Sequence, residues 1–225
     1  MRICVIGLGG VGSILIERLC RFLNYSGSDL NPEIVLVDGD TYEAKNYERQ
    51  EFVRMGNKAS IKAAELNMKF SQLKLEALES FVDPSNIKEI INDGNTVFLC
   101  VDNHKTRMIV SNYCKSLQNV TLISGGNELV DGNVQLYVRR KGNDLTPDLC
   151  KYHPEIANPD DKLPNEMSCE ELSRSDPQLY FTNLGVATIM CWTFYNAIIK
   201  KSYERSEIYF DILTMNSSSK VRATN

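Results

Sequence analysis

Residues 2–22, RICVIGLGGVGSILIERLCRF, decide the fold of this 225-residue chain. A short apolar run over residues 2–6 leads directly into a glycine-rich turn. Behind the turn, apolar residues recur at helical spacing from Val11 to Phe22. The stretch therefore predicts a strand, a tight loop and a helix in immediate succession.

The loop carries the pattern G-x-G-x-x-G at Gly7, Gly9 and Gly12. Glycines at these positions permit a tight turn, and they let backbone N–H groups approach a phosphate where the helix dipole favours negative charge. The position between a predicted strand and a predicted helix makes the pattern specific for nucleotide binding. The alternative interpretation is a purely structural turn.

Outside this stretch, apolar runs that read as strands alternate with helical patterns. The predicted strands are 34–37, 73–78, 96–101 and 120–123, and the helical stripes are 59–70 and 110–117. This alternation predicts an α/β fold with a Rossmann-like, mostly parallel sheet and helices on both faces. After residue 125 the pattern changes to an antiparallel strand (132–140), a long apolar helix (178–199) and a last strand (208–214). We therefore expect antiparallel strands to extend the sheet toward the C-terminus.

A single domain over residues 1–225 accounts for this order of elements. Its nucleotide-binding half is 1–124, and its substrate-facing half is 125–225. Within the second half, residues 141–176 are rich in Pro, Asn and Asp and show no clear period. A loop of that length in a compact domain is usually functional or mobile.

Composition excludes several classes of protein. The 25 Lys and Arg against 29 Asp and Glu give a net charge of −4, which argues against a nucleic-acid binder. Seven cysteines without a Cys-x-x-Cys pair predict neither a disulfide framework nor a paired-thiolate zinc site, so a reducing cytoplasm fits best. Residues 178–199 carry no charge and are long enough to span a bilayer, but scattered Thr and Asn favour a helix buried in a soluble domain.

Two aspartates lie at predicted strand ends. Asp38 follows the second strand, where an acidic side chain in a dinucleotide-binding fold hydrogen-bonds ribose hydroxyls. Its alternative role is that of a solvated carboxylate that begins a turn. Asp102 follows another apolar strand. Because ligands of open α/β sheets lie outside the carboxyl ends of the strands, both should converge with the glycine loop. These features alone fit a dehydrogenase and an ATP-using enzyme equally well.

Arg49 and Lys58 separate those two functions. Hydride transfer gives no reason for cations near the nucleotide, whereas transfer at a phosphate needs them where charge builds up. Lys58 lies in the first turn of the predicted helix over 59–70, next to its apolar stripe. From spacing alone, solvated surface charges remain an equal alternative, because that is the usual place of Lys and Arg.

Four motifs in order, GLGGVGS (7–13), DGDTYEAKNYERQEF (38–52), GNKA (56–59) and FLCVDN (98–103), give the chain a family resemblance. They resemble the adenylation domain shared by ubiquitin-activating enzymes and the bacterial ThiF/MoeB adenylyltransferases. The remaining segments HPEIANPDD, SCEELSRSDPQLYFTNLGVAT and YFDILTMNSSSKV are similar to the ThiF-like proteins of bacterial PRTRC gene clusters.

The resemblance implies an ATP site, position by position. Residues that would hold the nucleotide are Gly7, Gly9, Gly10, Gly12, Ser13, Asp38 and Asp40. It further implies that Asn46, Arg49 and Lys58 contact the phosphates and that Gln50 buttresses them. Asp102 would bind Mg²⁺. Arg49, Lys58 and Asp102 are thus the expected catalytic residues.

By the same resemblance, the reaction would activate the C-terminal carboxylate of a ubiquitin-like or sulfur-carrier-like small protein as an acyl-adenylate. The segment 141–176 would guide that tail across the sheet, and the chain would work as a homodimer. Two other functions stay open, an NAD-dependent oxidoreductase and a catalytically silent nucleotide-binding scaffold.

The chain also departs from the family pattern. Many members carry helices before the first strand, with an arginine that reaches the neighbouring subunit's ATP; the given sequence begins at the strand, so we assign that role to no residue. Cys150, His153 and Cys169 lack the fourth ligand of a tetrahedral site, so zinc is not expected, and His153 reads as a loop residue. Cys169 lies where thioester-forming members keep a reactive cysteine. Neighbouring glutamates would raise its pKa, which favours a structural thiol.

Overall fold

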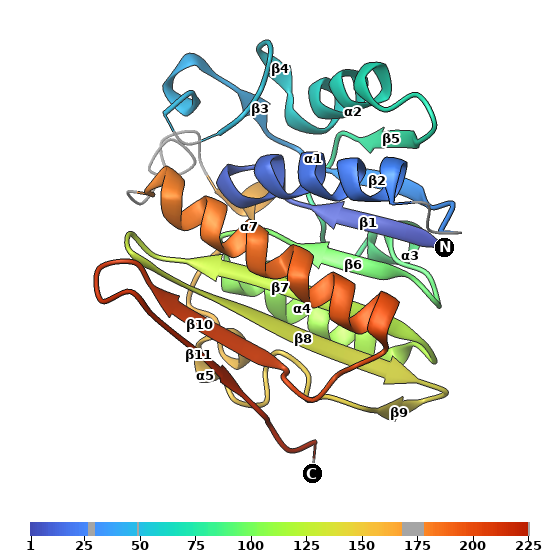
Figure 1. Cartoon of the computed structure of the whole chain (residues 1–225), viewed down its shortest axis with the longest axis vertical. Helices are drawn as coiled ribbons and strands as arrows, with labels where there is room; N and C mark the ends of the chain where they lie inside the picture. The colour runs from blue at the N-terminus through green and yellow to red at the C-terminus, as the bar shows by residue number, and fades with distance from the viewer. Residues whose placement is uncertain (27–29, 49, 168–177, 225) are drawn as a thin grey trace.

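The chain folds around one large mixed sheet (Figure 1). The computed structural model describes residues 1–26, 30–48, 50–167 and 178–224. The strand order is β11-β10-β8-β7-β6-β1-β2-β5. The parallel strands are β1 (Arg2–Ile6), β2 (Glu33–Val37), β5 (Lys74–Leu78), β6 (Thr96–Leu99) and β7 (Val120–Asn127). Nearly every residue of β1, β2 and β6 is buried, as expected of parallel strands covered on both faces.

Antiparallel strands extend the sheet beyond β7, as predicted. They are β8 (Asp131–Arg140), β10 (Glu207–Asp211) and β11 (Asn216–Lys220), and the short β9 (Asn143–Asp144) pairs with β8. The last predicted strand is longer than the observed one. β10 ends at Asp211 because the carboxylate of Asp211 accepts the N–H groups of Leu213 and Thr214 at 2.8 and 2.9 Å, which turns the chain.

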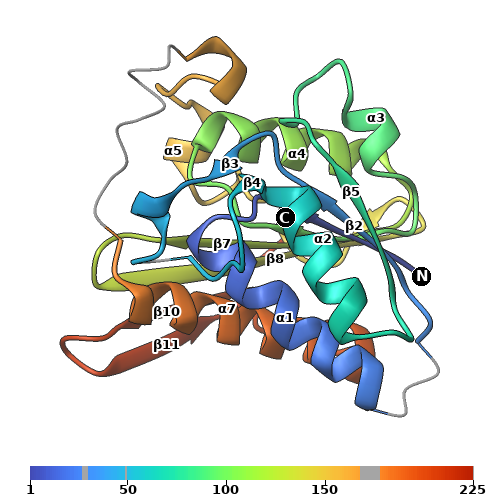
Figure 2. The ribbon, with the colours of Figure 1, turned by 90° about the horizontal axis from the view of Figure 1, so that it is seen from above.

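Helices cover both faces of the sheet (Figure 2). One face carries α1 (Gly10–Tyr25), α2 (Lys58–Lys69) and α7 (Tyr180–Phe194), and the other carries α3 (Ile87–Ile90), α4 (His104–Ser116) and α5 (Pro154–Ala157). The side chains of Asn57 and Asn103 cap α2 and α4 by accepting the N–H groups of Ser60 and Thr106. Three single turns complete the described helices, η1 (Ala44–Asn46), η2 (Pro164–Glu166) and the π-helical η3 (Tyr195–Lys200).

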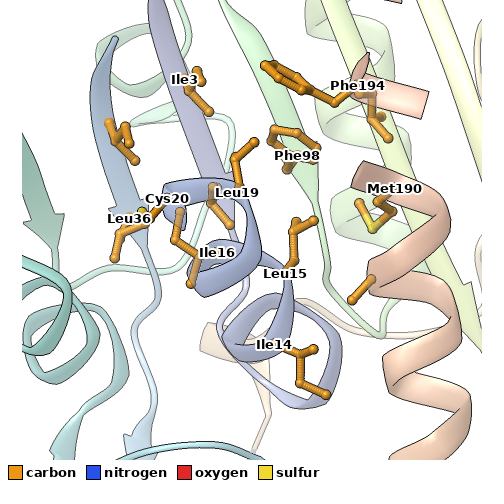
Figure 3. Packing of buried hydrophobic residues seen from close by; sticks show 14 of the residues in the cluster. Ile3, Ile14, Leu15, Ile16, Leu19, Cys20, Leu36, Phe98, Met190 and Phe194 are labelled. Carbon is orange, nitrogen blue, oxygen red and sulfur yellow. The ribbon is translucent and has the colours of Figure 1, made fainter. Parts of the chain in front are cut away.

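The larger core lies between the sheet and the pair α1–α7 (Figure 3). Strand residues Ile3, Leu36 and Phe98 meet Leu15 of α1 and Phe194 of α7 there, and all five side chains are buried. Full burial of one such side chain stabilises the fold by about 1.5 to 3 kcal/mol. These contacts fix the first turn of α1 against the sheet, and the glycine loop immediately precedes that turn.

The long apolar helix differs from the sequence prediction on one side. Its inner face is buried, but Phe181, Trp192 and Tyr195 are exposed on the outer face. The helical pattern could not show this, because α7 is apolar around its whole circumference. Among the described residues, no helix is long and apolar enough to cross a membrane.

A small two-stranded sheet, β3 (Thr41–Tyr42) with β4 (Gly56–Asn57), lies beyond the carboxyl end of β2. The segment 141–176 also contains more structure than expected, since its described part forms β9, α5 and η2. The order of the large sheet reverses between β1 and β6, because the chain passes from β1 to β2 on one side and later adds β6 on the other. Such a switch point is where open α/β sheets bind ligands, beyond the carboxyl ends of the strands.

Candidate functional site

The glycine loop occupies the switch point. Gly7 has a φ of +88°, and a Cβ there would lie 2.8 Å from the carbonyl oxygen of Cys100, so only glycine makes this turn. A Cβ at Gly12 would lie 1.9 Å from the carbonyl oxygen of Gly7, which makes Gly12 the point of closest packing between helix and strand. Gly9 alone of the three has room, because the atom nearest to its Cβ position is Gln50 Nε2 at 3.9 Å. A phosphate can therefore approach the backbone at Gly9.

The N-terminus of α1 is available to an anion. No side chain caps this helix, in contrast to α2 and α4, and its first turn contains no acidic residue. The first N–H groups of a helix have no partner within the helix and carry the positive end of its dipole. The turn at Gly9 and Gly10 thus presents uncapped donors to whatever occupies the switch point.

Two predicted nucleotide residues of this loop face inward. A Cβ at Gly10 would lie 2.2 Å from Nδ2 of Asn183, so the absence of a side chain at Gly10 allows α1 and α7 to pack closely. Ser13 is fully buried, and its hydroxyl donates to the carbonyl oxygen of Gly9 at 2.7 Å. Gly10 and Ser13 therefore support the loop from the side that faces the protein interior.

Asp38 is tied to the loop across the sheet. One carboxylate oxygen accepts the N–H of Leu8 at 2.6 Å, and the other accepts the N–H of Asp40 at 2.8 Å. Burial raises the pKa of Asp38 above its ordinary value, although the nearby charge of Lys58 and both hydrogen bonds oppose the rise. Each carboxylate oxygen keeps a lone pair for a further donor, such as a hydroxyl group.

Lys58 lies within this cluster and not in bulk solvent. Its side chain is buried, 8 % exposed, and its ammonium donates to the carboxylate of Asp40 at 2.5 Å. Asp40 is exposed at the mouth of the site, two residues after Asp38. The ring of Tyr42 lies 5.8 Å from the ammonium, and its hydroxyl donates to the carbonyl oxygen of Leu8 at 2.9 Å. Lys58 is therefore a preplaced cation beside the glycine loop.

Asn46 and Gln50 are both buried in the segment between β3 and β4. The Asn46 side chain accepts the N–H of Glu43 at 2.9 Å and so closes the turn η1. Gln50 points toward Gly9, and its Oε1 is buried without a hydrogen-bond partner among the described residues. An unpaired buried amide oxygen is costly, so the Gln50 oxygen is available to a donor from a ligand or from water.

Asp102 lies three residues beyond β6 and is exposed at the same edge. The sequence prediction missed its neighbour Arg107, which is buried on α4 and donates to the carbonyl oxygens of Val101 and Gly125 at 2.8 Å each. Burial lowers the pKa of the Arg107 guanidinium, while the charge of Asp102 opposes the change. Arg107 thereby fixes the loop that carries Asp102, and no spacing rule would have indicated a buried arginine there.

Polar side chains continue from Asp102 across the α4 face of the sheet. Ser124 on β7 is opposite Gln135 on β8, and Gln135 is opposite Glu207 on β10. Gln135 is 3 % exposed, and both of its amide atoms lack a partner among the described residues.

Arg49 and Cys169, two of the predicted site residues, lie outside the described part of the chain.

His153 is not a simple loop residue. Its two ring nitrogens lie 2.8 Å from Glu155 and 3.0 Å from Glu207, and Glu207 also accepts hydrogen bonds from Tyr209 and Arg222. Hydrogen bonding to Glu207 raises the pKa of His153. Burial alone would raise the pKa of Glu207, but its hydrogen bonds lower it to about 2. No group of three His, Cys, Asp or Glu side chains that could hold a metal ion occurs in residues 1–26, 30–48, 50–167 and 178–224.

This cluster predicts a pH dependence of stability. Because the folded pKa of His153 is above the unfolded value of about 6.5, the stabilisation is complete below that pH and is lost as the pH rises through the folded pKa. We expect the free energy of unfolding to fall from pH 6.5 to 9 in the wild type and to fall less in His153→Gln. Urea titrations at each pH measure this, and parallel pH profiles would contradict it.

Two cavities of about 250 and 510 Å³ lie elsewhere in the molecule. Both are lined by Ser202 and Glu204, in the connection between η3 and β10, and neither includes a residue of the glycine loop. The candidate site lies at the switch point, where Asp38 and Lys58 adjoin the glycine loop and Asp102 follows the neighbouring strand β6.

Known proteins with longer chains are similar to this sequence over part of their length. A tRNA threonylcarbamoyladenosine dehydratase of Haemophilus influenzae is 32 % identical over 135 residues, which cover 57 % of this chain and 49 % of that protein. A SAMP-activating enzyme E1 of Haloferax volcanii is 28 % identical over 142 residues. These residues cover 61 % of this chain and 49 % of that protein. The chain thus spans about half the length of these relatives.

Solved structures show the same fold. E. coli MccB with ATP superposes with a TM-score of 0.74 at 18 % identity, over 98 % of this chain and 63 % of that one. MccB in complex with N-formylated MccA superposes with a TM-score of 0.76 at 17 % identity. The superposition covers 100 % of this chain and 65 % of that one. The closer likeness to the PRTRC proteins stays a prediction. Residues 1–224 match the ThiF family, so the chain belongs to that family.

Proposed function

We propose that the chain is an ATP- and Mg²⁺-dependent adenylyltransferase that activates the C-terminal carboxylate of a ubiquitin-like or sulfur-carrier-like small protein. One observation carries the proposal: the buried ammonium of Lys58, paired with Asp40, lies close enough to affect Asp38, and Asp38 binds the glycine loop through the N–H of Leu8. Hydride transfer gives no reason for a cation at this place, whereas transfer at phosphorus needs one where charge builds up.

The residues present fit ATP. The turn at Gly9 would receive the phosphates on uncapped N–H groups, and Asp38 would bind the ribose hydroxyls with its free lone pairs. Lys58 would exchange Asp40 for a phosphate oxygen, and Asn46, Arg49 and Gln50 would complete the phosphate contacts. The MccB structure with ATP supports this placement, because it shares the fold.

The residues also fit a magnesium ion. Mg²⁺ in nucleotide enzymes is usually held by one or two carboxylates together with the substrate phosphates. Asp102 supplies an exposed carboxylate at the right edge of the sheet. When bound, Mg²⁺ supplies electrostatic stabilisation of the charge that develops on the phosphates.

In the proposed reaction, a carboxylate oxygen of the substrate attacks the α-phosphorus of ATP. A new P–O bond forms, the bond to the β-phosphate breaks, and pyrophosphate leaves with its electron pair. Lys58 and Arg49 would stabilise the charge on the phosphorus as it becomes five-coordinate. The product is the acyl-adenylate of the small protein.

The substrate tail would cross β7 and β8 beneath the segment 141–176 to reach this phosphorus. Adjacent strands are about 4.8 Å apart, so Gln135 lies about 10 Å from β6, or roughly three residues of extended tail. The unpaired amide of Gln135 can both donate to and accept from a peptide main chain. SAMP-activating enzyme E1 among the relatives and the MccB–MccA complex support a protein or peptide substrate.

Substitution of Lys58 tests the proposal. We expect Lys58→Met to slow ATP–pyrophosphate exchange by about 10² to 10³-fold, because a preplaced donor to the transition state is lost. The assay includes candidate small proteins, with intact mass used to detect an adenylated C-terminus. Lys69→Met is the control, because Lys69 lies at the far end of α2 and pairs with Glu17 at the surface.

The same assays separate the alternatives. Wild-type protein that binds NADH far more tightly than ATP would favour an oxidoreductase. Binding of ATP without exchange in the presence of any carboxylate would favour a silent scaffold. The homodimer is carried over from the resemblance, and the mass of the protein in solution tests it. The cytoplasmic location rests on the cysteine pattern alone.

A further inference from the structure

The segment between β3 and α2, residues 43–57, is the arm of the candidate site. It carries Asn46 and Gln50, and it leaves the body of the protein at the small sheet β3–β4. Stacked rings stiffen it, because Phe52 lies between Tyr42 and Tyr47 at centroid distances of 4.4 and 4.3 Å. The stack joins the arm to Tyr42, whose hydroxyl bonds to Leu8 of the glycine loop, but an attachment to the helix α1 requires another residue.

Glu51 makes that attachment. Its carboxylate accepts two hydrogen bonds from the guanidinium of Arg18 on α1, at 2.7 and 3.2 Å, and a third from the hydroxyl of Tyr180 on α7. Its backbone N–H donates to the hydroxyl of Ser13 at 3.4 Å, and that hydroxyl in turn donates to the carbonyl oxygen of Gly9. One residue of the arm is thus bonded to two helices and, through Ser13, to the glycine loop.

The charges around Glu51 favour its ionised form. Burial by itself would raise the pKa of Glu51, but the hydrogen bonds from Arg18 and Tyr180 lower it below its ordinary value. The ammonium of the fully buried Lys62 on α2 also lowers it, while Lys62 forms its own ion pair with Glu65 at 2.9 Å. A two-pronged arginine–carboxylate pair is geometrically specific and stronger than a neutral hydrogen bond.

The position of Glu51 matters because Gln50 is its direct neighbour. The Gln50 amide is the group nearest to the open side of Gly9, at 3.9 Å from the Cβ position. A shift of the arm along α1 would therefore move Gln50 relative to the phosphate cradle. We propose that Glu51 is a positioning residue that, through Arg18 and Tyr180, holds the arm over the glycine loop and so sets the affinity for ATP. This inference rests on the proposed function.

Isothermal titration with ATP and Mg²⁺ tests the inference without a protein substrate. We expect Glu51→Gln and Arg18→Met each to weaken ATP binding about tenfold, the effect of losing one charge-assisted contact. The double variant should bind ATP no more weakly than either single variant, because both remove the same interaction. Arg18→Lys, which keeps the charge, should recover part of the affinity.

The control is Glu17→Gln. Glu17 is the residue before Arg18 on α1 and forms a surface ion pair with Lys69, so this variant removes a neighbouring ion pair that does not contact the arm. All variants are compared at a temperature at which circular dichroism shows each to be fully folded. Unchanged ATP affinity in folded Glu51→Gln would overturn the inference.

Hydrogen exchange of the ATP-free protein gives an independent readout. Amides of residues 50–57 should exchange faster in Glu51→Gln than in the wild type, while those of β1 should not change. Equal exchange in the arm would also overturn the inference. A wild-type chain that binds no ATP would refute the proposed function, and the exchange experiment would then decide alone whether Glu51 holds the arm.

Discussion

Asp102→Ala is expected to reduce ATP–pyrophosphate exchange by at least about 10²-fold, which corresponds to roughly 2.7 kcal/mol in the activation free energy. The residue is exposed and follows β6, so its removal leaves no cavity in the core. The reaction would lose the carboxylate assigned to Mg²⁺ at the point where charge develops. Exchange of labelled pyrophosphate into ATP measures the loss, and far-ultraviolet circular dichroism checks that the fold persists.

The matched control is Asp131→Ala. Asp131 is an exposed carboxylate at the start of β8, at the same edge of the sheet. Loss of general negative charge would affect both variants alike, whereas a specific role affects Asp102 alone. An Asp102→Ala protein that exchanges pyrophosphate at the wild-type rate would remove Asp102 from the reaction.

Gly12→Ala should destabilise the protein by about 3 kcal/mol or more, because its Cβ would lie 1.9 Å from a carbonyl oxygen that the sheet holds in place. For a chain of this size that corresponds to a fall in melting temperature of roughly 6 to 12 °C. Gly9→Ala meets no atom closer than 3.9 Å, although the backbone there has φ −73° and ψ −144°, outside the regions that alanine prefers. It should therefore lose much less stability than Gly12→Ala but should lose ATP affinity, since the methyl group would occupy the phosphate approach.

Calorimetric melting and ATP titration of both variants test this pair of expectations. The glycines share one motif, so a general effect of adding a methyl group would appear in both proteins. Equal melting temperatures for the two variants would contradict the separate roles assigned to Gly12 and Gly9.

The fold was predictable wherever local pattern and backbone geometry determine it. The turn at Gly7 requires a positive φ, which glycine adopts readily, so the sequence marks the turn directly. The apolar run before it fits a strand covered on both faces. The order of strands and helices therefore followed from residues close in sequence. The contact of Asp38 with the loop followed from a rule about parallel sheets, and by the same rule the approach of Asp102 to the loop stays a prediction.

The contacts that complete the site could not be predicted in the same way. Glu51 and Tyr180 are 129 residues apart, and Gly10 meets Asn183 from α7, so no period or motif links them. The resemblance assigned Ser13 to the nucleotide, yet its hydroxyl serves the turn itself. His153 lies in a segment without periodicity, and its ion pair with Glu207 depends on a strand 54 residues later.

The outer face of α7 has a practical consequence for all of these measurements. Trp192 is the only tryptophan in the sequence, and 61 % of it is exposed. Its indole already contacts water in the native state, so emission from this residue will report poorly on unfolding. The same fluorophore will shift to shorter wavelength when another molecule covers that face, which makes it a built-in probe of association.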